Sequence, residues 1–300
     1  MTIRVGTASW TDPTLIKCKC FYPLDAKTAE QRLQFYASKF DTVEVDSTYY
    51  AMPGSDTALA WVERTPPGFV FDVKAFRLFT LHQTPIKALP SVLRDEAARF
   101  ANDRGNVYYP DIAPEVKDDL WRRFTELLAP LKEAGKLGYV LFQLPPWVMK
   151  RRSNFEHLAE CAERLDGFTV AVEFRNATWF KEEERGETLA NLREQNLALV
   201  IVDEPQGTGV SIPSVWEATS PDLSVVRFHG RNQETWTKKN LTAAERFNYL
   251  YSEEELRALA GPVDRLARET RQVHAIFNNC YEDKAIRNAT RFIELLANKP

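Results

Sequence analysis

The feature that most constrains the fold of this chain is an alternation between short apolar runs and longer stretches of helical periodicity. The apolar runs favour β-strands at residues 3–9, 42–47, 69–75, 138–144, 169–175, 197–203, 224–230 and 272–278. Helical periodicity lies between or after them at residues 26–39, 57–64, 114–134, 155–165, 182–195, 252–270 and 285–297. Eight strands that alternate with helices predict an α/β fold of the TIM type, in which parallel strands close into a (β/α)8 barrel.

Three connections depart from the plain strand–helix pattern. Residues 76–137 and 231–271 are too long to hold one helix each, and both leave the end of a strand where a barrel places its active site. We therefore expect their first parts to form loops over a cleft, whereas residues 204–223 should cross between two strands without a helix. No linker or repeat divides the chain, so we predict a single domain over residues 1–300.

The second predicted strand carries charges where a buried strand should not. Val43 and Val45 share one face, and Glu44 and Asp46 share the other. A strand in a parallel barrel is covered on both faces, so ionised carboxylates there cost several kcal/mol each unless cations or hydrogen bonds compensate them. The fold must therefore place cations opposite this strand.

The same alternation, applied to the other strands, selects the residues that point into the barrel. Besides Glu44 and Asp46, the inward and strand-end positions hold polar side chains that an apolar barrel core would not contain: Asp72, Lys74, Gln143, Glu173, Arg175, Asp203, Arg227, His229, Asn278 and Asn279. The members that we expect to surround one cavity are Glu44, Lys74, Glu173, Arg175, Asp203, Arg227 and His229.

Two interpretations of this polar set remain open. The carboxylates and cations nearly cancel, so they can form a self-paired network without a ligand; alternatively, Arg175 and Arg227 clamp a phosphate or carboxylate of a substrate. His229 is either a neutral, hydrogen-bonded imidazole or a catalytic group. The aromatic residues that follow strand ends either stack on a sugar or base or pack at the rim, and these are Trp10, Tyr49, Tyr50, Trp147 and Trp179.

A divalent metal is the alternative use of the same carboxylates. Oxygen ligands with one imidazole suit Mn or Mg better than Zn, and the ends of four strands supply Glu44, Glu173, Asp203 and His229. The inward arginines compete for these carboxylates, and no local ligand spacing supports a metal site. We therefore predict no cofactor.

The overall charge limits the classes of partner. The chain has 39 basic and 42 acidic residues and a net charge of −3, which disfavours nucleic acid and anionic membranes as partners. Its four cysteines are too few and too scattered for a disulfide framework, as expected for a reduced cytosolic protein. No secretory leader or apolar run of membrane length is evident, so we predict a cytoplasmic location.

Eight ordered motifs cover nearly the whole chain. They are G-T-A-S-W at residues 6–10, F-Y-P at 21–23, T-V-E-V-D-S-T-Y-Y at 42–50, F-D-V-K-A at 71–75, L-F-Q-L-P-P at 141–146, V-E-F-R-N-A-T-W-F at 172–180, R-F-H-G-R at 227–231 and F-N-N-C at 277–280. Together they resemble the YecE-like family, also called domain of unknown function 72 (DUF72). Asp46 stands where that family usually has asparagine. The resemblance implies a TIM-type barrel and brings no established activity, although such barrels are distantly similar to xylose-isomerase-type enzymes and apurinic endonucleases.

The sequence favours an enzyme that acts by acid–base chemistry on a small polar ligand, either anionic or like a sugar phosphate. In this hypothesis Glu44 or Glu173 is the base, and His229 or Lys74 is the acid or stabilises charge. Asp203 completes the catalytic set, and the predicted ligand-binding residues are Trp10, Asp46, Tyr49, Gln143, Arg175, Arg227, Asn278 and Asn279. The alternatives are a non-catalytic barrel that binds a ligand or nucleic acid, and a metal-dependent isomerase or phosphodiesterase.

Overall fold

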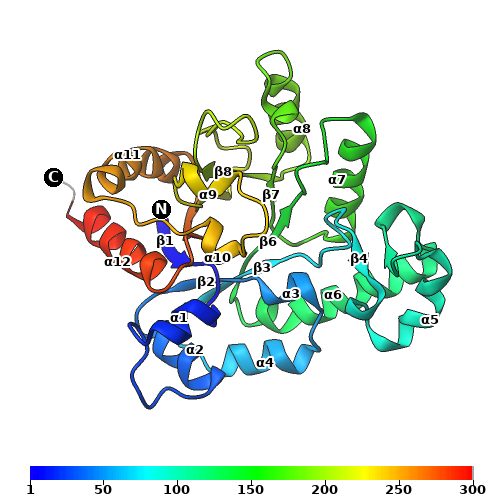
Figure 1. The fold of residues 1–300 in the computed structure, drawn as a ribbon, viewed down its shortest axis with the longest axis horizontal. Coiled ribbons are helices and arrows are strands. Elements are labelled where there is room, and N and C mark those ends of the chain that lie inside the picture. The colour runs from blue at the N-terminus through cyan, green and yellow to red at the C-terminus, as the bar shows by residue number, and fades with distance from the viewer. Residues whose placement is uncertain (299–300) are drawn as a thin grey trace.

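A parallel β-barrel forms the centre of the molecule in the computed structural model, which describes residues 1–298, so residues 299–300 of the predicted domain lie outside it (Figure 1). Its eight strands follow the order β1-β10-β9-β8-β7-β6-β3-β2. The first and last strands of this order meet, because Ala8 forms a parallel bridge with Glu44 and the Ser9 amide donates to the Glu44 carbonyl at 2.8 Å. The predicted α/β barrel of the TIM type is therefore confirmed.

The predicted strands are all present, and most end slightly before the predicted residue. They are β1 (Thr2–Thr7), β2 (Thr42–Val45), β3 (Val70–Lys74), β6 (Leu137–Gln143), β7 (Val170–Glu173), β8 (Ala198–Asp203), β9 (Leu223–Phe228) and β10 (Gln272–Phe277). β2 stops early because the next residues form a short helix, α3 (Ser47–Tyr50). Several polar residues predicted at strand ends, Asp46 and Arg175 among them, therefore stand just beyond the strands.

The seven predicted helices surround the barrel (Figure 1). They are α2 (Ala29–Ala37), α4 (Ser55–Glu63), α6 (Pro114–Glu133), α7 (Arg152–Arg164), α8 (Arg185–Glu194), α11 (Glu253–Glu269) and α12 (Lys284–Ala297). Capping boxes begin two of them, with Thr28 ahead of α2 and Ser252 ahead of α11. Residues 204–222 contain no helix, as predicted. Within residues 1–298, no helix is both long and apolar enough to cross a lipid bilayer.

Several short elements were not predicted. They are the helices α1 (Pro13–Cys18), α3, α5 (Arg94–Ala97), α9 (Gln233–Trp236) and α10 (Ala243–Arg246), and the antiparallel pair of β4 (Thr84–Pro85) and β5 (Asn106–Val107). Short 3-10 turns occur at Ile86–Ala88, Ser91–Leu93, Ala98–Phe100, Tyr109–Asp111 and Ala177–Phe180. The long connection after β3 therefore holds β4, α5 and β5 at the side of the barrel (Figure 1). The connection after β9 holds α9 and α10.

Two glycines allow close approaches inside the barrel. A Cβ on Gly6 would lie 2.3 Å from the Thr42 carbonyl oxygen, so glycine lets β1 approach β2 and close the sheet. A Cβ on Gly138 would lie 2.1 Å from Asp72 Oδ1. Asp72 is fully buried, and its Oδ2 lies 2.8 Å from Nδ1 of the equally buried His274. Gly138 thus provides the space for a charged or polar pair in the barrel interior.

Candidate functional site

A cavity of about 930 Å³ opens at the carboxyl ends of the strands. Each of the eight strands contributes a lining residue at or just beyond its end, and these residues are Ser9, Asp46, Lys74, Gln143, Arg175, Glu204, Arg227 and Asn278. Further lining residues come from α9, α10 and the segment that follows, including Trp236, Arg246 and Phe247. This is the end of a TIM-type barrel at which enzymes of this fold place their active sites.

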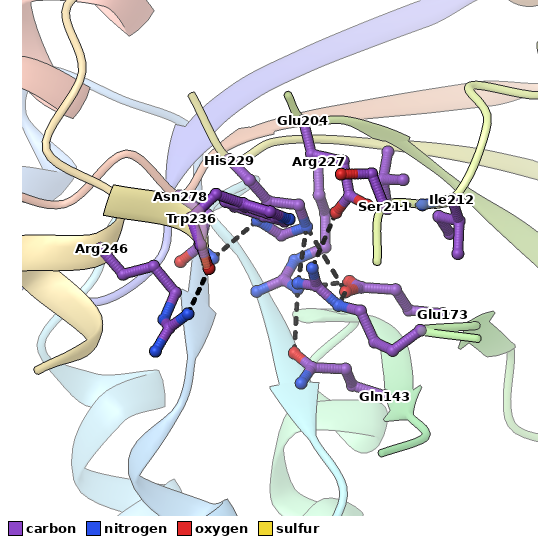
Figure 2. A network of polar contacts seen from close by, with 12 residues as sticks. Gln143, Glu173, Glu204, Ser211, Ile212, Arg227, His229, Trp236, Arg246 and Asn278 are labelled. Atoms are coloured by element: carbon purple, nitrogen blue, oxygen red, sulfur yellow. Dashed lines mark hydrogen bonds and ion pairs between the residues drawn. The ribbon is translucent and has the colours of Figure 1, made fainter. Parts of the chain in front are cut away.

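Arg227 forms the centre of the charged floor beneath this cavity. Its Nη2 donates to Glu44 Oε1 at 2.6 Å, and its Nη1 donates to Glu173 Oε2. Both carboxylates are fully buried, and Arg227 is 1% exposed. Nη1 also lies 3.3 Å from Gln143 Oε1 (Figure 2). Through Glu44, Gln143 and Glu173 the arginine thus links β9 to β2, β6 and β7.

Arg175 continues the network toward the crossover that follows β8. It pairs with Glu173 through Nε, and its Nη1 donates to Glu204 Oε2 at 2.9 Å. The other oxygen of Glu204 accepts from the Ile212 amide at 2.8 Å. Carboxylates and guanidiniums therefore alternate along a continuous chain: Glu44, Arg227, Glu173, Arg175 and Glu204. This alternation compensates the buried charges that the sequence placed on β2 and β7.

His229 is a neutral hydrogen-bonding group in this network. Burial and the adjacent Arg175 lower the pKa of His229 to about 3, and Arg175 Nη2 donates to Nε2 at 2.8 Å. A neutral imidazole that accepts at Nε2 carries its proton on Nδ1. Nδ2 of the Asn278 amide is placed 2.9 Å from that nitrogen, where two donors would face each other, so the proton on Nδ1 requires the flipped amide, whose oxygen accepts from His229 and whose NH2 group is left for the cavity. Of the two interpretations of His229, the geometry supports the neutral one.

The two central carboxylates have opposite acidities. Burial raises the pKa of Glu44 to about 7, and the opposing charge of Arg227 only partly offsets this. Burial also acts to raise the pKa of Glu173, but Arg175 and Arg227 together outweigh it and hold that pKa well below its usual range. Glu173 is therefore the permanent anion of the site, whereas Glu44 exchanges a proton near neutral pH.

Lys74 lies at the edge of the cavity floor and has fewer charged partners than the arginines. Its Nζ is 3.4 Å from Asp46 Oδ1, and it stands 4.9 Å from the centre of the Tyr49 ring. The side chain is 12% exposed, so its ammonium can meet a ligand without leaving its position. Asp46, Lys74 and Tyr49 thus line one side of the cavity, and their roles toward a ligand stay a prediction.

Six predicted site residues do not line the cavity. Glu44, Glu173 and His229 are fully buried in the network beneath it, and Trp10, Asp203 and Asn279 have other partners. The carboxylate of Asp203 binds Arg231 and accepts from the Tyr251 hydroxyl at 2.7 Å. Successive residues of a strand point to opposite faces, and Glu204 is the residue at this strand end that lines the cavity. The expected place of Asp203 was therefore wrong by one residue.

Trp10 and Asn279 pack and form hydrogen bonds within the protein core instead. Trp10 packs edge-on against Trp61 and Phe71, at centroid distances of 6.0 and 6.4 Å, and is 7% exposed. Asn279 is fully buried, and its amide donates to the Tyr249 carbonyl and to Asn288 Oδ1, both at 2.9 Å. Neither side chain lines the cavity, so the structure does not bring them together with the other predicted ligand-binding residues.

The two long connections differ in their relation to the cavity. The connection after β9 contributes Trp236, Ala243, Ala244, Arg246 and Phe247 to its wall, as expected of a covering loop. No residue of 76–137 lines the cavity, so that expectation was wrong for the connection after β3. Its hydrophobic residues pack beside the barrel with α6 instead, and stacking of Phe79 on Trp121 at 3.8 Å is one such contact.

The contributions of Glu204 and Phe247 were missed in the sequence. Glu204 follows Asp203 directly, and neighbouring residues at a strand end point to opposite sides. Once the end of β8 is known, this alternation indicates which of the two faces the cavity. Phe247 stacks on His229 at a centroid distance of 5.4 Å and follows a four-residue helix. No periodic pattern marks such a segment, so the sequence offers no signal for this contact.

The carboxylates of the site are bound by cations rather than grouped around an empty centre. Within residues 1–298, no three histidine, cysteine, aspartate or glutamate side chains are grouped so that they could hold a metal ion. Arg227 occupies the space between Glu44 and Glu173, and Arg231 binds Asp203. The four residues considered as metal ligands are thus divided between two sets of partners. That the protein needs no metal stays a prediction.

Comparison with known proteins gives a family across the full length of the chain. The family described as "Protein of unknown function DUF72" matches residues 4–300. The UPF0759 protein YunF of Bacillus subtilis (strain 168) is 32% identical over 299 residues, which cover 98% of this chain and 94% of that protein. The UPF0759 protein YecE of Escherichia coli (strain K12) is 26% identical over 203 residues, which cover 67% of this chain and 59% of that protein.

Solved structures with the same fold carry the same family description. A DUF72 family protein from Thermotoga maritima MSB8 has a TM-score of 0.76 and 29% identity, with 99% of this chain and 100% of that chain covered. A DUF72 family protein from Enterococcus faecalis V583 has a TM-score of 0.79 and 26% identity, with 100% of this chain and 97% of that chain covered. The relatives YunF and YecE are designated UPF0759 proteins. The predicted family resemblance is confirmed, and this chain belongs to the DUF72 family.

Proposed function

We propose that this barrel is an enzyme that binds a small anionic ligand in the strand-end cavity and acts on it by acid–base chemistry. The observation that carries the proposal is the juxtaposition of cations that line the cavity with a buried carboxyl group that titrates near neutral pH. Lys74, Arg175 and Arg227 all line the cavity, and Glu44 lies directly behind Arg227. A self-paired network without a ligand would need neither the open cavity nor a lysine that faces it.

In the proposal, Lys74 and Arg227 bind the anionic group, while Gln143 and Asn278 donate hydrogen bonds beside it. Arg227 holds Glu44 and Glu173 with different nitrogens, so it can keep Glu173 while its other end turns toward the ligand. That movement exposes Glu44, whose pKa of about 7 suits both uptake and release of a proton. His229 keeps Arg175 in place and takes no proton itself.

The test measures melting temperature with a panel of anions at constant ionic strength: carboxylates, phosphates and sugar phosphates. A ligand that binds the native state at about 100 times its Kd stabilises it by roughly 2.7 kcal/mol, which a melting curve resolves. We expect at least one anion to stabilise the wild type and to lose most of this effect in Lys74→Met. Lys181→Met is the matched control, because Lys181 is exposed and does not line the cavity.

The catalytic half of the proposal is tested with the stabilising anion itself. Wild type and Glu44→Gln are incubated with it, and products are followed by mass spectrometry. We expect Glu44→Gln to bind the anion but to lose turnover by roughly 100-fold or more, as is typical for removal of an acid–base group. If no anion in the panel stabilises the wild type beyond sodium chloride, the proposed function is wrong.

A further inference from the structure

The walls of the cavity differ in chemistry from its floor. The floor is polar and charged, with Lys74, Gln143, Arg227 and Asn278. The walls carry polar side chains such as Ser9, Thr11, Asp12, Ser47 and Arg246, but also a set of aromatic and aliphatic ones: Tyr49, Tyr50, Pro146, Val210, Trp236, Ala243, Ala244 and Phe247. A ligand that fills the cavity therefore needs one polar end and one apolar body.

Two pairs of aromatic residues stand on different sides of the cavity mouth. Tyr49 and Tyr50 belong to α3, which follows β2, whereas Trp236 and Phe247 belong to the connection after β9. In the barrel, β1 and β10 lie between β2 and β9 on one side, and β3, β6, β7 and β8 on the other. The two pairs are thus nearly opposite each other, with the cavity between them.

At least one of these rings is not fully covered by packing within the protein. Tyr50 is 62% exposed, and the Tyr49 ring meets it only edge-on, at a centroid distance of 5.0 Å. The Tyr50 ring is therefore open to solvent and to a ligand. On the other side, Phe247 stacks on His229, and Trp236 lies 5.8 Å from Phe247 at an interplanar angle of 52°. Of the four rings only Tyr50 is exposed, while Trp236 is 7% exposed, so Tyr50 is the ring best placed to stack on a planar group above the cationic floor.

We propose that the ligand is an anion that carries an aromatic ring, with its charged group on the floor and its ring between the two aromatic pairs. This inference rests on the proposed function, because it assumes the same anion-binding floor. A sugar phosphate would fit the floor but would leave the four aromatic rings without a planar partner. The volume of about 930 Å³ accommodates a ring together with a phosphate-sized group.

Three phosphonates separate the ring from the charge, because they share one head group. Phenylphosphonate carries a planar ring, cyclohexylphosphonate carries a ring of similar size without π-electrons, and methylphosphonate carries neither. We expect isothermal titration calorimetry to show roughly tenfold tighter binding of phenylphosphonate than of methylphosphonate, the lower end of a stacking contribution. Cyclohexylphosphonate should bind several-fold more weakly than phenylphosphonate.

Variants of the wall and floor should affect different parts of this preference. Tyr50→Ala should remove most of the advantage of phenylphosphonate and leave methylphosphonate binding unchanged, while Tyr50→Phe should retain the advantage. Lys74→Met should weaken all three phosphonates alike. Phe100→Ala is the control, because Phe100 is also an exposed ring, 38% exposed, but lies in the connection after β3 away from the cavity.

The possible outcomes separate this inference from the proposed function. Equal affinities for the three phosphonates would overturn the aromatic ligand and leave the anion site standing. An advantage for phenylphosphonate that survives Tyr50→Ala would also overturn it, because the ring would then bind elsewhere. If none of the three binds and the anion panel also has no effect, both the proposed function and this inference fail.

Discussion

Arg227 is the side chain on which the buried charges of this barrel depend. It is 1% exposed and is shared by two carboxylates, Glu44 and Glu173, that are fully buried. Taking ions out of water costs several kcal/mol each, and here one guanidinium compensates much of that cost for both anions. A barrel that kept only the two carboxylates would have to protonate them or admit water.

The substitution Arg227→Met should therefore lower the free energy of unfolding by about 3–5 kcal/mol at about pH 8, since it leaves two buried carboxylates without their shared cation. Urea denaturation measures this change. Arg152→Met is the control, because Arg152 is 93% exposed and pairs only with Glu156 on the surface, so the change should stay below about 1 kcal/mol. The triple variant Glu44→Gln, Glu173→Gln, Arg227→Met should recover most of the loss. Equal stabilities of Arg227→Met and Arg152→Met would refute the central role of Arg227.

The sequence was sufficient to select most of the charged residues of the site but not their contacts. Alternation along the strands predicted that Glu44, Lys74, Glu173 and Arg227 point into one end of the barrel, because side chains of a strand point either to the surrounding helices or to the barrel interior. The alternation gave the wrong residue at the end of β8, where Glu204, and not Asp203, lines the cavity. The protonation of the network also could not be predicted, because it depends on distances between strands far apart in sequence.

Among the elements, β6 and β10 illustrate how a strand makes room for polar groups in the core. His274 of β10 and Asp72 of β3 form their buried pair beside Gly138, the second residue of β6. A Cβ there would lie 2.1 Å from Asp72 Oδ1 and 2.9 Å from His274 Cε1. Neither neighbour is the free end of a flexible side chain, so the pair would have to separate.

We therefore expect Gly138→Ala to destabilise the protein by about 1–3 kcal/mol through overpacking. Gly186→Ala is the matched control: Gly186 lies in the first turn of α8, where an added Cβ would meet nothing within 4 Å, so alanine should stabilise by about 0.4–1 kcal/mol. Thermal unfolding of both variants checks the opposite signs. A shift in the same direction for both would show that backbone entropy, and not the space beside Asp72, decides the effect.

Element type was predictable for long, periodic segments and unpredictable for short ones. The strands and the seven long helices carry periods of about 2 and 3.6 residues that burial enforces. α3 has the sequence S-T-Y-Y, in which β-branched and aromatic residues favour a strand, so the prediction extended β2 into its first residue and expected no helix there. Helices of four residues, such as α9 and α10, are stabilised by tertiary contacts rather than by propensity.

For the molecule as a whole, the buried network links global stability to pH through two groups of opposite sign. The pKa of Glu44 is raised from 4.5 to about 7, so the folded state holds a proton that the unfolded state releases, and stability falls as pH rises through this range. The pKa of His229 is lowered from 6.5 to about 3, so its contribution is lost as pH falls through that range. The free energy of unfolding of the wild type as a function of pH contains both effects. Comparing the wild type with a variant that lacks one of the two groups separates them.

Glu44→Gln provides that difference, because glutamine keeps the shape of the protonated carboxyl group and cannot ionise. A rise of this size in the pKa corresponds to a stabilisation of the protonated state on the order of 3 kcal/mol. Relative to the wild type, Glu44→Gln should therefore gain stability on going from about pH 5 to about pH 8, by up to this amount, in urea denaturation. Glu156→Gln, which alters an exposed pair with Arg152, is the control and should change by less than about 1 kcal/mol across the range. A difference between Glu44→Gln and wild type that stays constant with pH would mean that Glu44 remains ionised throughout, and would remove it from the acid–base role.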